Sequence, residues 1–279
     1  MSERFDLVIS GTGYPGQRRQ LVSAVGTLPR YYQVVPRADH HLAWVLAACP
    51  DWPDLVAEAL GANPLAVVVD EPMDPSPAAI DRLADAGIPL ILNTPQLFSP
   101  ALAQFAAAVG PLTLDWVEVL ALTAGDMSPQ TALFNALAML QAAGMPVKTL
   151  DSVVVGAQAV LADARLDTAH AHLSCVRGPH RQKATIKAFG PFGSLETLVG
   201  DPRAAFPGEV VKVDATGATV WPHSYQTPRR LALLEAHATM AESRNPLHSL
   251  SAYARPAALS AADRHWGGES VFLRKEHSS

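Results

Sequence analysis

The feature that most constrains this chain is a glycine-rich segment near its start, Gly11-Thr12-Gly13-Tyr14-Pro15-Gly16. It follows an apolar run of strand length at 5–10 and precedes 17–26, where apolar residues recur at helical spacing. A strand, a glycine-rich turn and a helix in this order are typical of a dinucleotide-binding fold, in which glycines let the backbone approach a pyrophosphate at the helix N-terminus. The alternative interpretation is a purely structural strand-to-helix turn.

Strand and helix patterns alternate as far as residue 110. Ser76 followed by Pro77 marks one helix start, because Pro is favoured in the first helical turn. This alternation predicts a parallel, doubly wound sheet. Further strands are expected at 31–35, 41–48, 65–69 and 88–92, and helices at 54–60, 76–86 and 100–109.

The pattern changes near Gly110 and Pro111, where strands begin to follow one another with few helices between them. Such runs favour antiparallel pairing. We therefore expect an α/β protein with a truncated Rossmann-type parallel sheet in 1–111 and an α/β domain with an open, mainly antiparallel sheet in 112–279. In the second domain, strands are expected at 112–122, 149–160, 170–177, 181–189, 193–199 and 209–221, and helices at 129–143 and 229–242.

The end of the second expected strand bears on the choice of dinucleotide. In such folds an acidic residue near this point binds the ribose diol, whereas an Arg pairs with the 2′-phosphate of NADP. Arg37 therefore favours NADP and Asp39 would favour NAD, and both remain open. The next strand follows so soon that the helix and strand that usually intervene are expected to be missing.

Charge and cysteine content exclude several classes of protein. The chain has 279 residues, with 21 Lys and Arg against 26 Asp and Glu, a net charge of -5. A nucleic-acid binder would show a basic face. Its two cysteines, Cys49 and Cys175, form no paired motif, which argues against a disulfide framework or a zinc site. Since neither a signal peptide nor a membrane span is evident, we expect a cytoplasmic protein with a small-molecule substrate and no nucleic-acid or membrane partner.

Several segments resemble the Gfo/Idh/MocA oxidoreductase family. The apolar run 65–69 leads into Asp70-Glu71-Pro72, where that family carries Glu-Lys-Pro, after Cys49-Pro50 and one helix. The sequence at 98–100 matches its aromatic-x-Pro, 113–122 resembles the first strand of its C-terminal domain, and 144–147 resembles its Gly-x-Pro-Val junction. The resemblance covers residues 5–160. It implies an NAD(P)-dependent oxidoreductase that forms a homodimer or other homo-oligomer through its C-terminal sheet.

The resemblance also assigns site residues, with departures. Glu71 stands in place of the family's motif Lys, and Gln130 and Phe134 align with its catalytic Asp and His. Gln and Phe are not proton carriers, so Glu71 is the expected catalytic residue. The residues implied in cofactor binding are Gly11, Thr12, Gly13, Tyr14, Pro15, Gly16, Arg37, Cys49, Pro50, Glu71 and Pro72.

Asn93-Thr94 is similar to a short motif of the thiazolinyl imine reductases of the same superfamily. Imine reduction needs hydride and one proton donor, so it tolerates this sparser set of residues. We expect a reductase of an imine or carbonyl in specialised biosynthesis, with a substrate site lined by Asn93, Gln96, Gln130 and Phe134. The alternative is a homologue that has lost hydride transfer and acts as a lyase, a cyclase or a non-catalytic binding protein.

Two other clusters allow alternative interpretations. His170 and His172 would lie on one face of a strand, as a metal pair could, but no carboxylate or Cys stands at useful spacing. A hydrogen-bonded or surface pair is favoured, and no metal site is predicted. Asp70 and Glu71 form either a paired-carboxylate site or a strand-end Asp beside a solvated Glu.

Overall fold

The computed structural model describes residues 3–14, 16–94, 96–110, 112–178, 182–201 and 208–261. These residues form two compact units that interleave in the sequence. The first unit takes 3–99 together with 226–258, and the second takes 100–201, 208–225 and 259–261. We expected a single boundary at 111/112. The grouping differs because residues 100–110 belong to the second unit and a late segment returns to the first.

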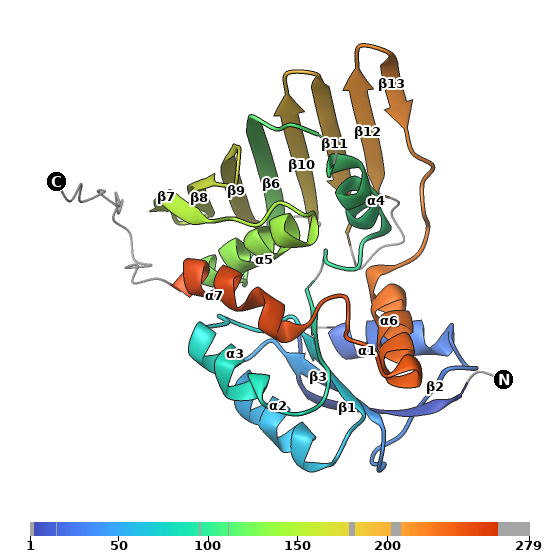
Figure 1. Ribbon diagram of the computed structural model, residues 1–279. Coiled ribbons are helices and arrows are strands. Elements are labelled where there is room, and N and C mark those ends of the chain that lie inside the picture. Colours follow the sequence, from blue (N-terminus) through green and yellow to red (C-terminus); the bar gives the residue numbers. More distant parts are fainter. Residues whose placement is uncertain are drawn as a thin grey trace. The chain divides into compact units, whose positions relative to one another are not determined.

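The first unit is built on a five-stranded parallel sheet in the order β2-β1-β3-β4-β5 (Figure 1). This confirms the predicted parallel sheet. The order reverses at β1. β2 pairs with one edge of β1, and β3, which follows β2 in the chain, pairs with the other edge. The elements are β1 (Phe5–Thr12), α1 (Gln17–Gly26), β2 (Tyr32–Val34), β3 (Leu42–Ala47), α2 (Trp52–Gly61), β4 (Ala66–Asp70), α3 (Pro77–Ala84) and β5 (Leu90–Asn93).

Helices cover both faces of this sheet. Every residue of β3, β4 and β5 is buried, which requires cover on both sides. α2 and α3 pack together on one side, and α1 packs with the late helix α6 (Pro228–Glu242) on the other (Figure 1). The Ser76 hydroxyl accepts a hydrogen bond from the Ala79 amide, as expected of the cap of α3.

The expected truncation is present between β2 and β3. Residues 35–41 join the two strands with neither a helix nor a strand. α6 packs beside this short part of the sheet, and the Tyr32 hydroxyl donates a 2.7 Å hydrogen bond to the Leu233 carbonyl. The His237 ring meets Tyr31 edge-on at 4.6 Å, and its Nε2 lies 2.8 Å from the Glu3 carbonyl. A helix nearly 200 residues later thus supplies cover that the shortened segment lacks.

The outer edge of β5 is also covered by late residues. The Leu92 amide donates to the His248 carbonyl, and Ile91 forms a bridge with Ser249. The buried His248 ring lies 3.2 Å from the Leu97 carbonyl and 2.7 Å from the Tyr253 hydroxyl, and burial lowers its pKa to about 4. Pairing of this kind protects an edge strand from association. The 3-10 helix η1 (Leu250–Tyr253) and α7 (Ala254–Ala261) follow.

The second unit contains an eight-stranded sheet in the order β13-β12-β11-β10-β6-β9-β8-β7. All pairs are antiparallel except β6 with β9, so the predicted mainly antiparallel sheet is confirmed. α4 and α5 pack on one of its faces. The elements are α4 (Pro100–Val109), β6 (Trp116–Ala124), α5 (Pro129–Ala142), β7 (Thr149–Val155), β8 (Ala159–Arg165), β9 (His170–Gly178), β10 (Lys183–Gly190), β11 (Gly193–Val199), β12 (Glu209–Asp214) and β13 (Gly217–Val220).

One local expectation in this unit was wrong. The single strand expected at 149–160 is a hairpin, because the chain turns at 156–158 and the Gly156 amide donates to the Ala159 carbonyl. Ser128 caps α5 by accepting from the Thr131 amide. The first residue of the strand expected at 181–189 lies outside the described residues.

The other face of this sheet carries large apolar side chains that are about 40% exposed. On β6, buried and exposed residues alternate, so Val117 and Val119 face the helices while Trp116 and Leu120 face away. Leu161 and Phe189 are similarly exposed. We call these four residues the open-face patch. No described helix is long and apolar enough to cross a membrane.

Candidate functional site

Polar residues converge where the strands of the first unit end. Gly11 pairs with Leu46, Leu46 with Asp70, and Asp70 with Asn93, which places one row across β1, β3, β4 and β5. In parallel sheets with helices on both faces, ligands bind outside the carboxyl ends where the strand order reverses. We call this region the carboxyl edge. It brings together the predicted glycine turn, Glu71 and Asn93.

The backbone of the glycine turn has the conformation that its sequence predicts. Gly11 and Gly16 have φ of 78° and 82°, in the left-handed region that favours glycine. A Cβ on Gly11 would lie 2.3 Å from the Leu46 carbonyl oxygen, so only glycine lets β1 approach β3 here. Gly16 immediately precedes α1. Thr12 is exposed, and Pro15 lies outside the described residues.

The side chain of Gln17 lies against this turn. Its Oε1 accepts a 2.8 Å hydrogen bond from the Tyr14 amide, and its Nε2 donates a 2.9 Å bond to Asp70 Oδ2. A Cβ on Gly13 would lie 2.1 Å from that Oε1. The backbone of the turn therefore fits a dinucleotide, but one of its N–H donors is already bonded. The fit requires one side chain, Gln17, to move.

Asp70 is the centre of a buried hydrogen-bond network. Trp44 Nε1 donates to its Oδ2 at 3.0 Å, the same oxygen that Gln17 reaches, and Asn93 Nδ2 donates to Oδ1 at 2.5 Å. A carboxylate with three donors is well compensated for its burial. Of the two interpretations of Asp70-Glu71, a strand-end Asp describes Asp70, and it holds β3, β5 and α1 together.

Glu71 is not solvated. It is 5% exposed, has a left-handed φ of 54°, and its Oε1 lies 3.2 Å from Arg229 Nη2. Arg229 also donates to Gln20 Oε1, and its Nη2 lies 3.9 Å from Asp70 Oδ2. Glu71 thus belongs to a buried ion pair, with Pro72 buried beside it in the sequence.

Sequence reasoning missed Gln17, Trp44 and Arg229. Thr227 and Pro228 signal a helix start, since the Thr227 hydroxyl accepts from the Arg230 amide. The helix expected at 229–242 accordingly began at Arg229, and the structure confirms it. The signal could not have shown that the helix returns to the carboxyl edge, because that depends on tertiary packing.

Three buried polar atoms at this edge have no hydrogen-bond partner among the described residues. They are Asn93 Oδ1, Thr94 Oγ1 and Arg229 Nε. Gln96 is also buried, and it follows Asn93 closely in the chain. Buried polar groups in folded proteins are nearly always satisfied. A polar group bound at this edge would satisfy these atoms.

The remaining predicted cofactor residues follow β2 and β3. Arg37 and Asp39 are both exposed, three and five residues beyond the end of β2. Cys49 is half-buried and Pro50 exposed. Burial raises the pKa of the Cys49 thiol to about 11, so it stays protonated and unreactive at neutral pH.

Gln130 and Phe134, predicted to line the substrate site, belong to α5 of the second unit. Phe134 is fully buried and Gln130 is half-buried. Their substrate role therefore stays a prediction.

The histidine pair lies on the open face of the second sheet. His172 Nδ1 is 2.8 Å from Asp163 Oδ1, and its Nε2 is 3.2 Å from Ser174 Oγ. Hydrogen bonds from His172 and Ser152 lower the pKa of Asp163. The order resembles a Ser–His–Asp relay, but β9 is paired on both sides, so its N–H groups serve the sheet rather than an oxyanion. Among the described residues no three His, Cys, Asp or Glu side chains gather as a metal site requires.

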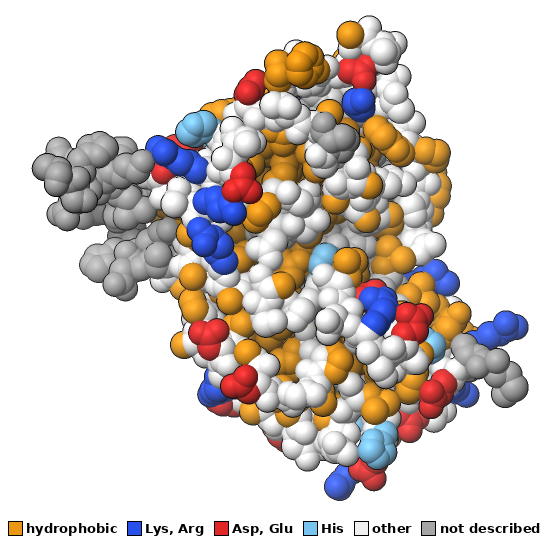
Figure 2. All heavy atoms as spheres, viewed as in Figure 1, with side chains coloured by type: hydrophobic (Ala, Val, Ile, Leu, Met, Phe, Trp, Pro, Cys, Tyr) orange, Lys and Arg blue, Asp and Glu red, His pale blue; other side chains and the backbone are white. Residues whose placement is uncertain are grey.

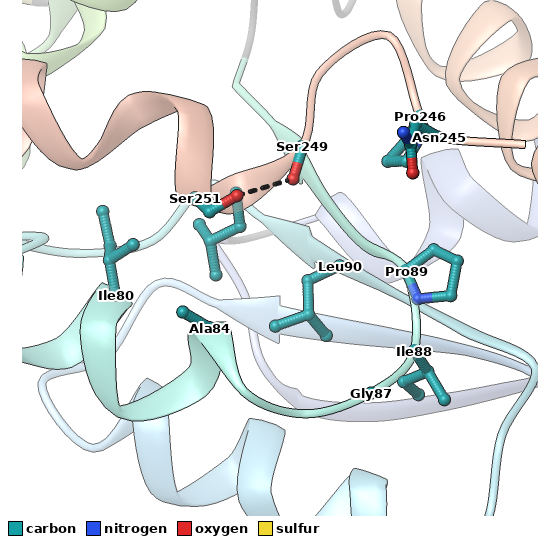
Figure 3. Close-up of a pocket in the computed structure, with 11 residues that line it drawn as sticks. Ile80, Ala84, Gly87, Ile88, Pro89, Leu90, Asn245, Pro246, Ser249 and Ser251 are labelled. Atoms are coloured by element: carbon teal, nitrogen blue, oxygen red, sulfur yellow. Dashed lines mark hydrogen bonds between the residues drawn. The ribbon is translucent and has the colours of Figure 1, made fainter.

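One cavity, of about 310 Å³, lies in the first unit (Figure 3). Its lining includes Pro89 and Leu90 at the start of β5 and Ser249 with Ser251 from the late segment, which share a 3.0 Å hydrogen bond. It is therefore at the opposite end of β5 from Asn93.

Figure 2 shows charged side chains of both signs interspersed on the visible face, with no single basic patch.

No protein-family model and no curated protein sequence matches the chain. Solved structures do. UDP-N-acetylglucosamine 3-dehydrogenase GnnA from Acidithiobacillus ferrooxidans aligns over 92% of this chain and 96% of its own, with 12% identity and a TM-score of 0.69. KijD10, a 3-ketoreductase from Actinomadura kijaniata solved with NADP, covers 93% and 96%, with 14% identity and a TM-score of 0.69.

Aldose-aldose oxidoreductase from Caulobacter crescentus is also similar, with a TM-score of 0.67 and 11% identity over 91% of this chain and 95% of its own. All three are oxidoreductases, and at these identities the likeness establishes the fold. This agrees with the sequence resemblance and with the two sheets described above. The chain therefore has the fold of the Gfo/Idh/MocA-type oxidoreductases.

Proposed function

We propose that this protein is an NAD(P)-dependent oxidoreductase whose reaction centre includes the carboxyl edge, and that it reduces an imine or carbonyl of a small molecule. The observation that carries the proposal is the set of unsatisfied buried atoms there: Asn93 Oδ1, Thr94 Oγ1 and Arg229 Nε. Asn93 ends β5, Thr94 follows it, and Arg229 lies in the first turn of α6, at the edge where such sheets bind ligands. A polar ligand would satisfy these atoms.

The cofactor would be held by Gly11, Gly13 and Gly16 at its pyrophosphate, with Thr12, Tyr14, Cys49 and Pro50 around it. Arg37, exposed beyond β2, would pair with a 2′-phosphate, so we propose NADP rather than NAD. When bound, the dihydronicotinamide supplies a hydride to the carbon of a C=N or C=O group. The protein must then orient the substrate, exclude water and deliver one proton.

Glu71 is the proposed proton carrier. Arg229 contacts its Oε1 and so fixes the carboxyl group in one orientation. Asn93 is fixed through its Nδ2 by Asp70, which leaves its Oδ1 available to accept a bond from substrate. Gln96, Gln130 and Phe134 would complete the substrate site. Glu71 would supply the one proton that reduction of a C=N or C=O bond requires, and Asn93 Oδ1 would orient the substrate.

Titration of the purified protein with NADPH and NADH, by calorimetry and fluorescence, tests the proposal. Binding of NADPH in preference to NADH, weakened at least tenfold for NADPH alone by Arg37→Ala, is expected. Absence of binding of either dinucleotide at millimolar concentration would overturn it.

The role of Glu71 has its own test once a substrate is found. Glu71→Gln should keep the fold and lose most turnover, because the amide cannot deliver a proton. Glu58→Gln, on the exposed side of α2, is the matched control and should leave turnover unchanged. Unchanged turnover in Glu71→Gln would remove Glu71 from the chemistry.

A second candidate is a non-redox or non-catalytic homologue that binds a metabolite at the same edge. The observation that favours it is the hydrogen bond from the Tyr14 amide to Gln17, since a donor already satisfied has less to offer a phosphate. Such a protein would not bind dinucleotides, and Glu71→Gln would leave its ligand affinity unchanged. The titration above therefore separates the two candidates.

We also propose that two copies pair through the open-face patch. Trp116, Leu120, Leu161 and Phe189 present apolar surface on the sheet face that no described helix covers, and exposed patches of this kind mark interaction sites. A row of Glu118, Lys187 and Glu196 crosses the same face, with Lys187 Nζ 3.3 Å from Glu196 Oε2. These charges would fix the register of the pair.

A further inference from the structure

We infer that Gln17 is an internal stand-in for a phosphate oxygen and sets how tightly the glycine turn binds a dinucleotide. Its carboxamide accepts from the turn amide that a phosphate would otherwise use, so a dinucleotide must displace it. This inference rests on the proposed function and identifies a residue that determines affinity at the same site.

The contact between Gln17 and the turn is close and specific. Oε1 accepts from the Tyr14 amide at 2.8 Å and lies where a Cβ on Gly13 would reach within 2.1 Å. That is the face on which the second glycine of such a turn admits a pyrophosphate. Pro15 has no amide hydrogen, so the N–H of Tyr14 matters more here than in a turn with two adjacent donors.

Gln17 is held at both ends. Its Nε2 donates to Asp70 Oδ2 at 2.9 Å, and the whole residue is 2% exposed. Only this orientation of the amide serves both partners, because the Tyr14 N–H needs an acceptor and the Asp70 carboxylate needs a donor. Displacing the side chain therefore breaks two hydrogen bonds, one of them to a charged group, and each loss weakens ligand binding.

The same contact links the turn to a fluorescent residue. Trp44 is fully buried, and its indole N–H donates to the Asp70 oxygen that Gln17 also contacts. When Gln17 leaves, that oxygen loses one of its two donors. The environment of the Trp44 indole should then change, although Trp44 lies within β3 and away from the turn itself.

The experiment compares dinucleotide affinity in wild type and Gln17→Ala, with Gln33→Ala on β2 as a matched control for an exposed Gln. We expect Gln17→Ala to bind NADPH about tenfold more tightly or better, which corresponds to about 1.4 kcal/mol. Gln33→Ala should bind as wild type does. Circular dichroism and thermal unfolding establish that each variant is folded.

Three outcomes are distinguishable. Tighter binding by Gln17→Ala supports the inference. Binding by wild type with equal or weaker binding by Gln17→Ala overturns the inference and leaves the proposed function standing. Failure of both proteins to bind at millimolar NADPH overturns both.

If Gln17→Ala does not fold, the tryptophan fluorescence of the wild-type protein tests the inference instead. NADPH binding should change tryptophan emission, and the change should disappear in Trp44→Phe. Binding measured by calorimetry without any change of emission that depends on Trp44 overturns the inference.

Discussion

Arg229 Nη2 lies 3.2 Å from Glu71 Oε1, although 158 residues separate the two in the sequence. Both side chains are buried, and the same guanidinium reaches Gln20 on α1. This pair ties a late helix to the end of β4. The buried carboxylate of residue 71 is thus matched by a cation supplied from α6.

Loss of this cation should destabilise the first unit strongly. Arg229→Met would leave the Glu71 and Asp70 carboxylates in a buried site without a positive partner, which costs about 3–5 kcal/mol. Urea unfolding monitored by tryptophan fluorescence measures the change. The double variant with Glu71→Gln should recover at least about 1 kcal/mol relative to the sum of the single effects. Additive effects would show that the pair is not coupled.

The glycines of the turn should tolerate substitution unequally. Gly11→Ala places a methyl group 2.3 Å from a backbone carbonyl and forces a left-handed φ, for a combined cost of about 3 kcal/mol. Gly26→Ala, where a Cβ meets nothing within 4 Å, is the matched control and should be neutral or slightly stabilising. Thermal unfolding of both variants checks this, and equal melting temperatures would contradict it.

Gly13→Val tests cofactor binding at the same turn. A Cβ there collides with the carboxamide of Gln17 and occupies the face that would admit a pyrophosphate. NADPH affinity should fall more than tenfold, while Gly26→Ala keeps wild-type affinity. Calorimetric titration of the two variants is the measurement. Retained affinity in Gly13→Val would place the dinucleotide elsewhere.

The free energy of unfolding should fall as the solution is acidified from pH 6.5 to pH 4. Burial lowers the pKa of His248 to about 4, whereas in the unfolded chain it is near 6.5, so the unfolded chain binds the extra proton first. The stabilisation is complete above pH 6.5 and is lost towards pH 4, by on the order of 3 kcal/mol.

Urea unfolding at pH 7, 5.5 and 4.5 measures this loss, with His248→Gln as the comparison. Burial also lowers the pKa of His41 and adds to the slope in the same direction. The informative quantity is therefore the difference in slope between wild type and variant. A variant as sensitive to pH as wild type would show that His248 does not cause the effect.

The proposed pairing of two copies should depend on the open-face patch. Leu120→Lys places a charge within the open-face patch and should shift the protein to monomer in analytical ultracentrifugation. Leu247→Lys, an exposed Leu of the first unit, is the control and should leave the mass unchanged. A wild-type protein that sediments as a monomer at all concentrations would refute the pairing.

Much of the fold was predictable from local sequence, because strand and helix signals are local. The turn at Gly11–Gly16, α4 and the capped start of α3 follow from apolar spacing, glycine and proline positions. The hairpin of β7 and β8 was missed because its turn at 156–158 contains only one glycine and no Pro, Asn or Asp. Apolar residues run on through it, so the pattern reads as one strand.

The candidate site was predictable only in part. Glu71 and Asn93 could be placed because each follows a buried strand, and parallel strands end at one edge. The burial of Glu71 could not be predicted, because it depends on Arg229 and on a helix that returns from residue 228. The role of Gln17 was equally hidden, since its second partner, Asp70, lies 53 residues away.

The return of α6 to the first unit has a consequence for synthesis on the ribosome. β1 to β5 emerge first, but Tyr32, Glu3 and Glu71 receive their partners from 229–237 only when most of the chain has been made. The eight strands of the second unit lie between these two parts, so that sheet can complete its pairing first. Until α6 has been made, the parallel sheet of the first unit lacks the cover that this helix gives. It is therefore the part of the nascent chain most in need of a chaperone.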